Sequence, residues 1–565
     1  MNSNTLNSTI QSSGRLPGKP LYVFLSLWCV LFLLYLPAVN GGWVSDTTEW
    51  LQKIKTQSFR DFVNVQQSRG SVYQFTQVVT FFLFKLFGSN PWPWHLVFIT
   101  MQAINSTLLY IICKKLFDES GVKNSFAIAA GGVLLFCTCP HISEVIVWKA
   151  SYHYLQALLM MLAILYCVQQ FHYRFRLIYP LIAAIIFLLS SFAHEFFYLS
   201  PLFVLTVIIY YRIVLAYDRI IYKKALLYFV LPMFIILLSH FILIRVVSGH
   251  FTADLGDEVH QPLSGYLRKP PLYLFHTVFF GRFFSHDTRQ KIYDFAVANK
   301  GIALVYGLLA CVWVYIIFRF RQMTPASKAV VLIFSWLHIC IAIVCPVWFP
   351  QTLLVNFDRY AYFMLPFIYL LFMFLLVNIK IKEWGITFFI VYAFINVYFT
   401  VQVNNYWKQS ARVVDHLVHN VPSIDNNKIV LLLNVPGNMN GVPMIGPFLH
   451  FSFRQMYNLY NERQINNTTY DVVSYNMSGP NDGAHVNVYN DSLMHVTLNQ
   501  WGTWWWYGMW GAFSYENEYY KLNMIDLGHW YELILKRPAS EYMLLYNVGD
   551  QWKVVDWNKK NDDQN

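Results

Sequence analysis

Long apolar runs recur along the chain up to about residue 400 and give way to a more polar C-terminal region. A transmembrane helix needs about 20 mostly apolar residues to cross a hydrocarbon core of about 30 Å. By this measure the chain is predicted to be an α-helical polytopic membrane protein with about 11 spans. The spans are expected over residues 21–38, 92–113, 124–140, 151–169, 178–193, 196–215, 225–245, 301–318, 329–349, 360–379 and 384–403.

Basic residues fall in alternate loops between these runs. They are Arg15, Lys19, Lys114, Lys115, Lys123, Arg174, Arg176, Arg219, Lys223, Lys224, Arg319, Arg321, Lys328, Lys380 and Lys382. Loops rich in lysine and arginine stay in the cytoplasm. This predicts a cytoplasmic tail over residues 1–20, a transmembrane domain over 21–403 and a C-terminal domain outside.

Two further apolar stretches, residues 72–88 and 271–284, are short and carry Lys85 and Arg282. Counting either as a span would place the later basic loops outside, so both are interpreted as interfacial helices on the outer leaflet. The first run is interpreted as a span rather than a signal peptide, because no A-x-A cleavage pattern follows it.

Residues 404–565 predict a separate extracytoplasmic domain, either α+β or mainly β. Alternating segments such as 485–489 and 541–546 indicate strands, and residues 435–441 are rich in turn formers. The aromatic stretch Trp501–Trp510 favours packing over a sugar-stacking platform, since buried aromatic clusters are commoner than exposed ones.

Composition agrees with a membrane protein, because 56% of the residues are hydrophobic and only 13% are charged. The net charge of +11 comes from the basic loops, so we expect membrane lipids and no nucleic acid as partners. None of the eight cysteines follows Cys345, so no disulfide framework is indicated.

The expected span cores contain no Asp or Glu, which disfavours an ion-coupled transporter. His95, His240 and His338 lie within spans and are interpreted as structural. The ionisable residues instead gather in predicted outer loops. They are Asp46, Glu49, His141, Glu144, Lys149, His153, His194, Glu195, Asp358 and Arg359.

The first outer loop carries Asp46 and Glu49, three residues apart and therefore on one face of a helix. Ser45 before them is a good helix N-cap residue. The motif is therefore compatible with a capping box bearing solvated acids and equally with a catalytic pair.

Five sequence elements, in order and on the predicted outer side, resemble the GT-C superfamily of membrane glycosyltransferases. This superfamily includes the dolichyl-phosphate-mannose protein mannosyltransferases and the aminoarabinose transferases of lipid A. The elements are Asp46 after the first span, Leu86–Pro91 with His95, Pro140–Glu144 with Trp148, Ser191–Glu195 with Pro201, and Asp358–Tyr360 with Pro366. The chain departs from the family pattern by placing its acids at Asp46 and Glu49, by lacking a proline after Arg69, and by carrying His194 where a lysine is usual.

The resemblance implies a GT-C-like fold and transfer of a sugar from a polyprenyl-phosphate donor to an acceptor hydroxyl of a glycan, lipid or protein, with inversion at the anomeric carbon. It makes Asp46 the expected base and Glu144 a second candidate. The expected substrate-binding residues are Glu49, Arg69, Lys149, His153, His194, Glu195, Arg282, Asp358 and Arg359, with Arg268 a further candidate for the donor phosphate.

No cofactor is expected. A divalent metal held by His141, Glu144 and His153 is an alternative that the spacing does not favour. Two other functions stay open, namely a polymerase or ligase that uses a lipid-diphosphate oligosaccharide, and a non-enzymatic transporter of lipid-linked sugars. The lack of cysteines in the outer domain favours a bacterial inner membrane.

Overall fold

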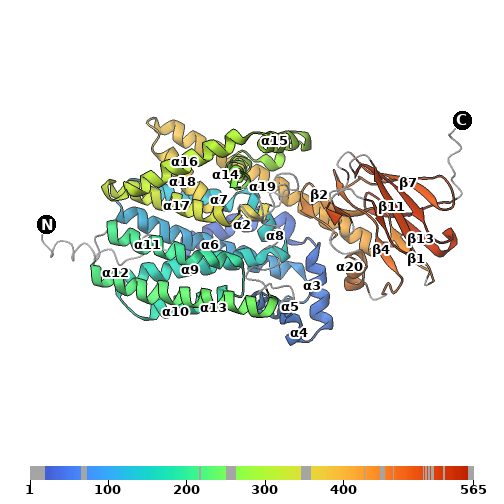
Figure 1. Cartoon of the computed structure of the whole chain (residues 1–565), viewed down its shortest axis with the longest axis horizontal. Coiled ribbons are helices and arrows are strands. Elements are labelled where there is room, and N and C mark those ends of the chain that lie inside the picture. The colour runs from blue at the N-terminus through green and yellow to red at the C-terminus, as the bar shows by residue number, and fades with distance from the viewer. Residues whose placement is uncertain are drawn as a thin grey trace.

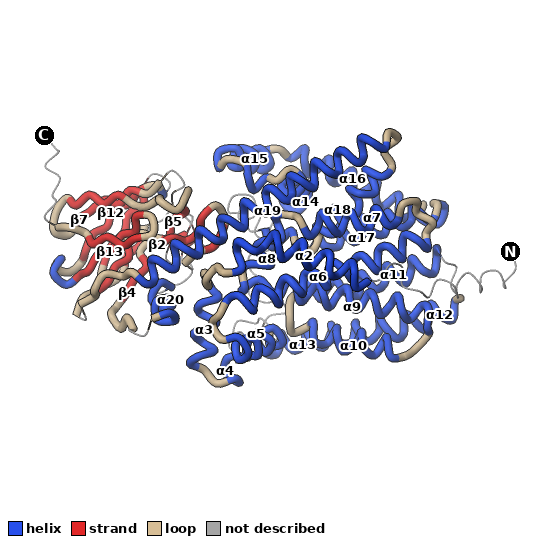
Figure 2. The backbone as a smooth tube through the Cα atoms, turned by 180° about the vertical axis from the view of Figure 1, so that it is seen from behind, coloured by secondary structure: helices blue, strands red, loops and turns tan. Residues whose placement is uncertain are grey.

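The computed structural model shows a bundle of long helices joined to a smaller domain of strands (Figure 1). The structure describes residues 20–64, 73–214, 218–249, 263–344, 358–425, 427–445, 452–461, 464–499, 502, 505–506, 509–510, 514–525 and 528–557. The bundle and the strand domain follow one another along the long axis of the molecule (Figures 1 and 2).

The bundle is built from eighteen described α-helices, which follow one another with short 3₁₀ and π turns between them. Their bounds are α2 Pro20–Val39, α3 Asp46–Thr56, α4 Phe59–Asn64, α5 Gln74–Phe87, α6 Pro91–Glu119, α7 Ser125–Cys137, α8 Ser143–Val147, α9 Tyr152–Arg174, α10 Ile178–Ser190, α11 Ser200–Val214, α12 Arg219–Ala225, α13 Leu231–Ser248, α14 Leu263–Val278, α15 His286–Ala298, α16 Lys300–Phe318, α17 Pro325–Val344, α18 Leu365–Val377 and α19 Lys382–His419. The turns are η2 Pro140–Ile142, η3 Lys149–Ser151, η4 Glu195–Leu199, η5 Leu226–Val230, η6 Gly281–Phe283, η7 Phe320–Gln322 and η9 Asp358–Ala361.

The predicted polytopic helical class is confirmed. Eight described helical segments are long and apolar enough to cross a membrane, and α7 with the bent segment Pro140–Val147 makes a ninth. The remaining two predicted spans form α10 and α18, which have 13 residues each and are shorter than expected. The chain leaves helical geometry early at these points, because 3₁₀ turns and loops at η4 and η9 replace the expected helix ends.

Helices α7 and α18 approach each other closely at the centre of the bundle. A Cβ atom at Gly132 would lie 3.1 Å from Cα of Leu370, and one at Gly131 would collide with Met373. Glycine at these positions therefore lets the two backbones meet, as small residues commonly do between membrane helices.

The longest helix, α19, has 38 residues and so spans about 57 Å, well beyond a hydrocarbon core. It runs past residue 403, where the transmembrane domain was expected to end, and enters the strand domain (Figure 2). There the indole nitrogen of Trp552 donates a hydrogen bond of 2.9 Å to the carbonyl of Leu417. The helix thus contacts both parts of the molecule.

The C-terminal domain is α+β, one of the two predicted classes. Besides α20 Ser452–Tyr460 and the turn η11 Ala539–Glu541, it contains strands β1 Ile429–Leu432, β2 Val435–Met439, β3 Val442–Pro443, β4 Thr469–Asp471, β5 Ser474–Met477, β6 His485–Val488, β7 Leu493–Thr497, β8 Trp505–Trp506, β9 Met509–Trp510, β10 Tyr515–Glu516, β11 Tyr520–Ile525, β12 Trp530–Leu535, β13 Tyr542–Val548 and β14 Gln551–Val554.

These strands form three sheets, ordered β14-β13-β1-β4, β10-β11-β12-β7-β6 and β3-β2-β5-β8-β9. The fully buried β1 pairs in parallel with both β13 and β4, with Val430 opposite Met543 and Thr469. A strand covered on both faces is expected to be wholly apolar, as Ile-Val-Leu-Leu is. The side chains of Trp505, Trp506, Met509 and Trp510 lie outside the described residues, so the expected role of Trp501–Trp510 stays a prediction.

Candidate functional site

Several predicted outer loops contact the C-terminal domain at one end of the bundle, which we call the junction. The backbone nitrogen of Ser45 donates a 2.6 Å hydrogen bond to the carbonyl of Met444. A guanidinium nitrogen of Arg282 donates a 3.1 Å bond to the carbonyl of Asn440, in the β2–β3 turn. These contacts join loops that are far apart in sequence to the same edge of the strand domain.

The first outer loop enters α3 through Ser45, whose φ of 53° is uncommon for a residue other than glycine. The Ser45 side chain makes no capping hydrogen bond, so the capping box is not formed; instead the Thr48 hydroxyl donates to the Ser45 carbonyl at 2.8 Å. Asp46 begins α3, but its side chain lies outside the described residues. Glu49 forms an ion pair of 2.5 Å with Lys53, one helical turn further on.

Glu144 in α8 and Arg359 in η9 form a buried ion pair at the junction. One carboxylate oxygen of Glu144 accepts a 2.9 Å bond from the backbone nitrogen of Arg359, and the other pairs with its guanidinium. The guanidinium carbon also lies 4.9 Å from the ring centroids of Trp148 and Tyr360. Two predicted site residues, separated by 215 positions, are therefore held together by charge and aromatic stacking.

Asp358 lies at the centre of a second buried cluster. Its carboxylate accepts a hydrogen bond from Arg282, lies 3.0 Å from Nδ1 of His141 and lies 3.7 Å from Nε2 of His276. Burial by itself raises the pKa of Asp358, but Arg282 and His141 outweigh it and hold that pKa well below its usual range. Asp358 is therefore an ionised structural partner that fixes η9 beside Arg359.

His141, His276 and Asp358 also offer one potential metal-ligand atom each within 4.8 Å of one another. The charge around them argues against a divalent ion, because Arg282 pairs with Asp358 and buried Arg289 interacts with both. A dication would add charge to a buried site that already has more cations than anions. This group differs from the metal alternative predicted from sequence, in which Glu144 and His153 accompany His141.

Lys149, the first residue of η3, is 5% exposed, and its ammonium lies 3.6 Å from the ring centroid of Trp43. It lines a small cavity together with Thr47, Trp148 and Trp407. Among the described residues, the Thr47 hydroxyl and both indole nitrogens are buried without a hydrogen-bond partner, and Lys149 has no ion pair. We call the cavity that these four side chains line the donor-group cavity, because each of them brings a hydrogen-bond donor.

A fourth group lies where α9 meets η4. The phenol of Tyr73 donates to Glu195, and His194 accepts a 3.0 Å bond from the backbone nitrogen of Phe196. His153 packs against His194, with ring centroids 5.0 Å apart. Burial, aided by the neighbouring Glu195, raises the pKa of Tyr73 well above its usual range, so the phenol keeps the proton that it donates.

The sequence did not point to four residues that complete these groups, namely Trp43, Tyr73, Tyr154 and His276. Tyr154 lies between two of the groups, because its ring centroid is 4.5 Å from that of His194 and its phenol interacts electrostatically with Arg359 and Glu144. Of these four, only His276 stands out in the sequence, because it is a polar residue within the apolar stretch 271–284.

The remaining predicted residues contribute differently. Arg268 donates to the carbonyl of Val297 at the end of α15 and so braces α14. Arg69 lies outside the described residues. His95, interpreted as structural, has its ring nitrogens 2.7 Å from the carbonyl oxygen of Val39 and 3.3 Å from that of Val147. It therefore connects the outer end of α2 to the segment that carries Glu144.

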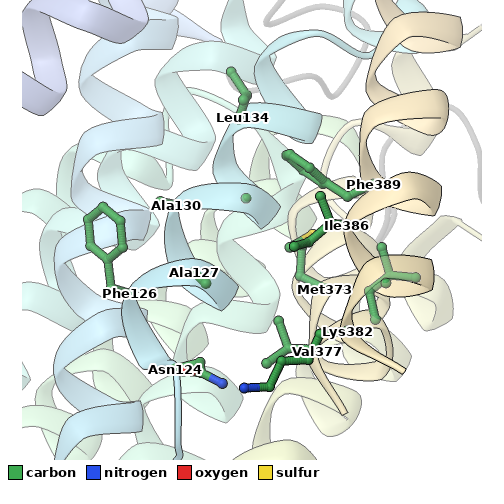
Figure 3. Close-up of a pocket in the computed structure, with 13 residues that line it drawn as sticks. Asn124, Phe126, Ala127, Ala130, Leu134, Met373, Val377, Lys382, Ile386 and Phe389 are labelled. Carbon is green, nitrogen blue, oxygen red and sulfur yellow. The ribbon is translucent and has the colours of Figure 1, made fainter. Parts of the chain in front are cut away.

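The opposite end of the bundle has a cavity of about 430 Å³ with a very different lining (Figure 3). Apolar side chains of α7, α18 and α19, such as Phe126, Leu134 and Phe389, form its walls. Asn124 and Lys382 lie together at one edge of it (Figure 3). Apart from Lys382, the described lining of this cavity has no charged side chain, whereas the junction gathers acids, histidines and arginines. We therefore take the junction as the candidate active site.

No protein-family model matches the chain, and no curated protein matches its sequence. The chain is similar to two solved structures of ArnT from Cupriavidus metallidurans, one bound to undecaprenyl phosphate and one in the apo state. Each is 12% identical in sequence, and the alignments cover 79% of this chain and 89% of ArnT, with TM-scores of 0.36 and 0.35. The proposed activity rests on the residues of the junction.

Proposed function

We propose that this chain is an integral-membrane glycosyltransferase that transfers a sugar from a polyprenyl-phosphate donor to an acceptor hydroxyl at the outer face of the membrane. The observation that carries the proposal is the donor-group cavity. The cavity, of about 10 Å³, has room for about one oxygen atom. A buried ammonium, a hydroxyl and two indole N–H groups suit an anionic phosphate oxygen at that place, because anionic oxygens form the strongest hydrogen bonds with such donors.

The position of the first outer loop supports Asp46 as the base. Asp46 precedes Thr47, which lines the donor-group cavity, so a phosphate bound there places the reacting sugar near the start of α3. In the transfer, the acceptor oxygen attacks the anomeric carbon while the bond from that carbon to the phosphate oxygen breaks. The proton of the acceptor goes to Asp46, and the bonding electrons leave with polyprenyl phosphate.

A single displacement of this kind inverts the configuration at the anomeric carbon. The developing charge on the leaving phosphate is stabilised by Lys149 and the neighbouring N–H groups, which the fold holds in place before the reaction. Glu144 is already paired with Arg359, so its proposed role is to position that guanidinium at the edge of the cavity through Trp148. His153, His194 and Glu195 shape the adjoining wall.

The proposed setting is a bacterial inner membrane with the junction and the C-terminal domain outside. The basic loops support this orientation, since Lys114, Lys123 and Lys382 belong to the end of the bundle away from the junction. The donor is then presented by the outer leaflet, with its polyprenyl chain among the membrane lipids.

The test is a transfer assay with the full-length protein in lipid nanodiscs, using a panel of radiolabelled polyprenyl-monophosphate sugars and an envelope extract as the source of acceptor. Wild type is compared with Asp46→Asn, Glu144→Gln and Asp61→Asn. Asp61 is the matched control, because it is an exposed aspartate in α4 whose carboxylate binds only the neighbouring Ser58 among the described contacts.

The proposal predicts transfer that Asp46→Asn reduces by about 10³-fold, within the usual range for general-base loss, while Asp61→Asn keeps it. Release of a lipid diphosphate instead of a monophosphate would identify the polymerase or ligase. Movement of intact lipid-linked sugar across the bilayer without release of the lipid would identify the transporter.

A further inference from the structure

A second cavity at the junction, of about 350 Å³, lies between α3 and α20, and we call it the polar groove. Its volume falls in the range of about 300–1,000 Å³ that is usual for small-ligand sites. Its lining contains one apolar residue and eight polar or charged ones. They are Glu49, Gln52, Lys53, Thr56, Arg454, Gln455, Asn458, Ile465 and Asn466.

One wall of the polar groove is a stripe along α3. The stripe consists of Glu49 and the residues three, four and seven positions after it, which are Gln52, Lys53 and Thr56. These spacings place the four side chains on one face of the helix. Position 46 lies three residues before Glu49 and therefore begins the same stripe. The groove thus extends along the helix that carries the proposed base.

The other wall comes from the C-terminal domain. Arg454, Gln455 and Asn458 lie on α20, and Asn466 lies on the loop that follows it. The Asn458 side chain accepts a 2.9 Å bond from the backbone nitrogen of Ile465, which holds this loop against the helix. The second wall is therefore ordered by its own hydrogen bonds.

Buried apolar residues and one polar contact hold the two walls together. Leu51 and Ile54 on α3 are at most 3% exposed, and Phe453 and Met456 on α20 are at most 1% exposed. The ammonium of Lys55 donates a 3.3 Å bond to the carbonyl of Leu459. The groove is consequently a fixed feature of the interface between the membrane bundle and the outer domain.

The chemistry of the lining separates the polar groove from the apolar cavity at the other end of the bundle. Four amide side chains line the groove, those of Gln52, Gln455, Asn458 and Asn466. Each offers donors and an acceptor, and charged groups lie beside them. Such a lining matches a ligand that presents many hydroxyl groups, since each hydroxyl both donates and accepts. A hydrocarbon chain would gain nothing there and would desolvate the polar groups.

We propose that the polar groove binds the carbohydrate part of the acceptor, so that the acceptor of this enzyme is a hydroxyl-rich glycan or glycan headgroup and not an apolar alcohol. The identification of the bound glycan as an acceptor rests on the proposed transferase function. Binding of a glycan to the groove is nevertheless measurable without any donor or turnover.

The test uses the full-length protein in fluorescent nanodiscs on an array of neutral and acidic oligosaccharides from bacterial envelopes, without donor. The glycan that binds best is then titrated against wild type, Gln52→Leu, Gln455→Leu and Gln57→Leu. Gln57 is the matched control, because it is a glutamine at the end of the same helix that does not line the groove.

The proposal predicts binding that each groove variant weakens about three- to tenfold, the effect of one lost hydrogen bond, while Gln57→Leu leaves it unchanged. With donor present, the same variants raise the KM for the acceptor and leave hydrolysis of the donor by water unchanged. Absence of binding by wild type to every glycan on the array overturns the proposal. Equal binding by Gln52→Leu and Gln57→Leu overturns it as well, and neither result bears on whether the donor is consumed.

Discussion

Ion pairs at the two ends of the helical bundle differ in how deeply they are buried. At the end away from the junction, the ion pair of Lys114 with Asp118 leaves the aspartate side chain 41% exposed. At the junction, the carboxylates of Glu144 and Asp358 are at most 2% exposed and are paired with arginines. At the junction, burying charge is costly unless each charge is paired, as those of Glu144 and Asp358 are.

The cavities show the same contrast. The cavity in Figure 3 is walled by apolar side chains from the membrane helices, and the polar groove at the junction has a single apolar residue in its lining. Where the bundle faces lipid, it offers hydrocarbon surface. Where it meets the outer domain, it offers hydrogen-bonding groups and the ammonium of Lys149, which has no ion pair among the described residues. This is the combination that the proposed transfer from a sugar phosphate requires.

The largest expected effect comes from breaking one ion pair at each end. Arg359→Met leaves Glu144 buried without its partner and should lower the free energy of unfolding by about 3–5 kcal/mol. Lys114→Met removes a partly exposed pair and should cost less than about 1 kcal/mol. Thermal unfolding of both variants in the same detergent measures the difference, and equal losses would show that the two ends do not differ.

Lys149→Met should stabilise the protein, in contrast to Arg359→Met. The variant removes a buried ammonium that has no anionic partner among the described residues, at the expense of its stacking on Trp43. We expect the free energy of unfolding to rise by about 1–2 kcal/mol, because an uncompensated buried charge costs more than the stacking returns. A fall in the melting temperature would indicate that Lys149 is a structural cation.

A smaller effect, dependent on pH, is expected within the outer domain. Burial raises the pKa of Asp471 from 3.8 to about 8, although hydrogen bonds from Phe453 and Ser452 oppose this. Between these values the folded state holds a proton that the unfolded state has released, so stability falls as pH rises from about 4 to 8. Asp471→Asn should therefore raise the melting temperature by about 2–4 °C at pH 8 and leave it nearly unchanged at pH 4.

The smallest effect on stability and activity is expected from a metal chelator. Because Arg282 and Arg289 outnumber the carboxylate of Asp358 around His141 and His276, EDTA should change neither the melting temperature nor sugar transfer. Loss of transfer in EDTA that zinc or manganese restores would assign these histidines to a metal site and reverse our interpretation of this cluster.

The helical part of the fold was predictable because an apolar run long enough to cross a membrane is an unmistakable pattern. The last span was expected to end at residue 403, and the helix that contains it continues to His419. Hydropathy detects where a helix leaves the lipid and carries no information on where its backbone hydrogen bonds end. For the same reason it overestimated the lengths of α10 and α18.

The sequence predicts which loops carry the residues of the candidate site. It does not predict which of these residues contact one another. The sequence placed Glu144, Asp358 and Arg359 on the outer side, but it gave no reason to pair Asp358 with Arg282, 76 positions away. Long-range pairs of this kind depend on how α14 folds over the bundle, which no local pattern encodes. Likewise, the aromatic contact of Trp43 with Lys149 follows from tertiary packing and not from spacing.

The proposed reaction requires that the donor-group cavity bind a lipid phosphate. The decisive measurement is the affinity of radiolabelled polyprenyl monophosphate for wild type, Lys149→Met and Lys114→Met in nanodiscs of neutral lipid. We predict that Lys149→Met weakens binding of polyprenyl monophosphate about 10- to 100-fold, as expected for loss of a charged hydrogen bond. We expect Lys114→Met to bind it like wild type. Equal affinity of all three proteins for the lipid phosphate would contradict this prediction.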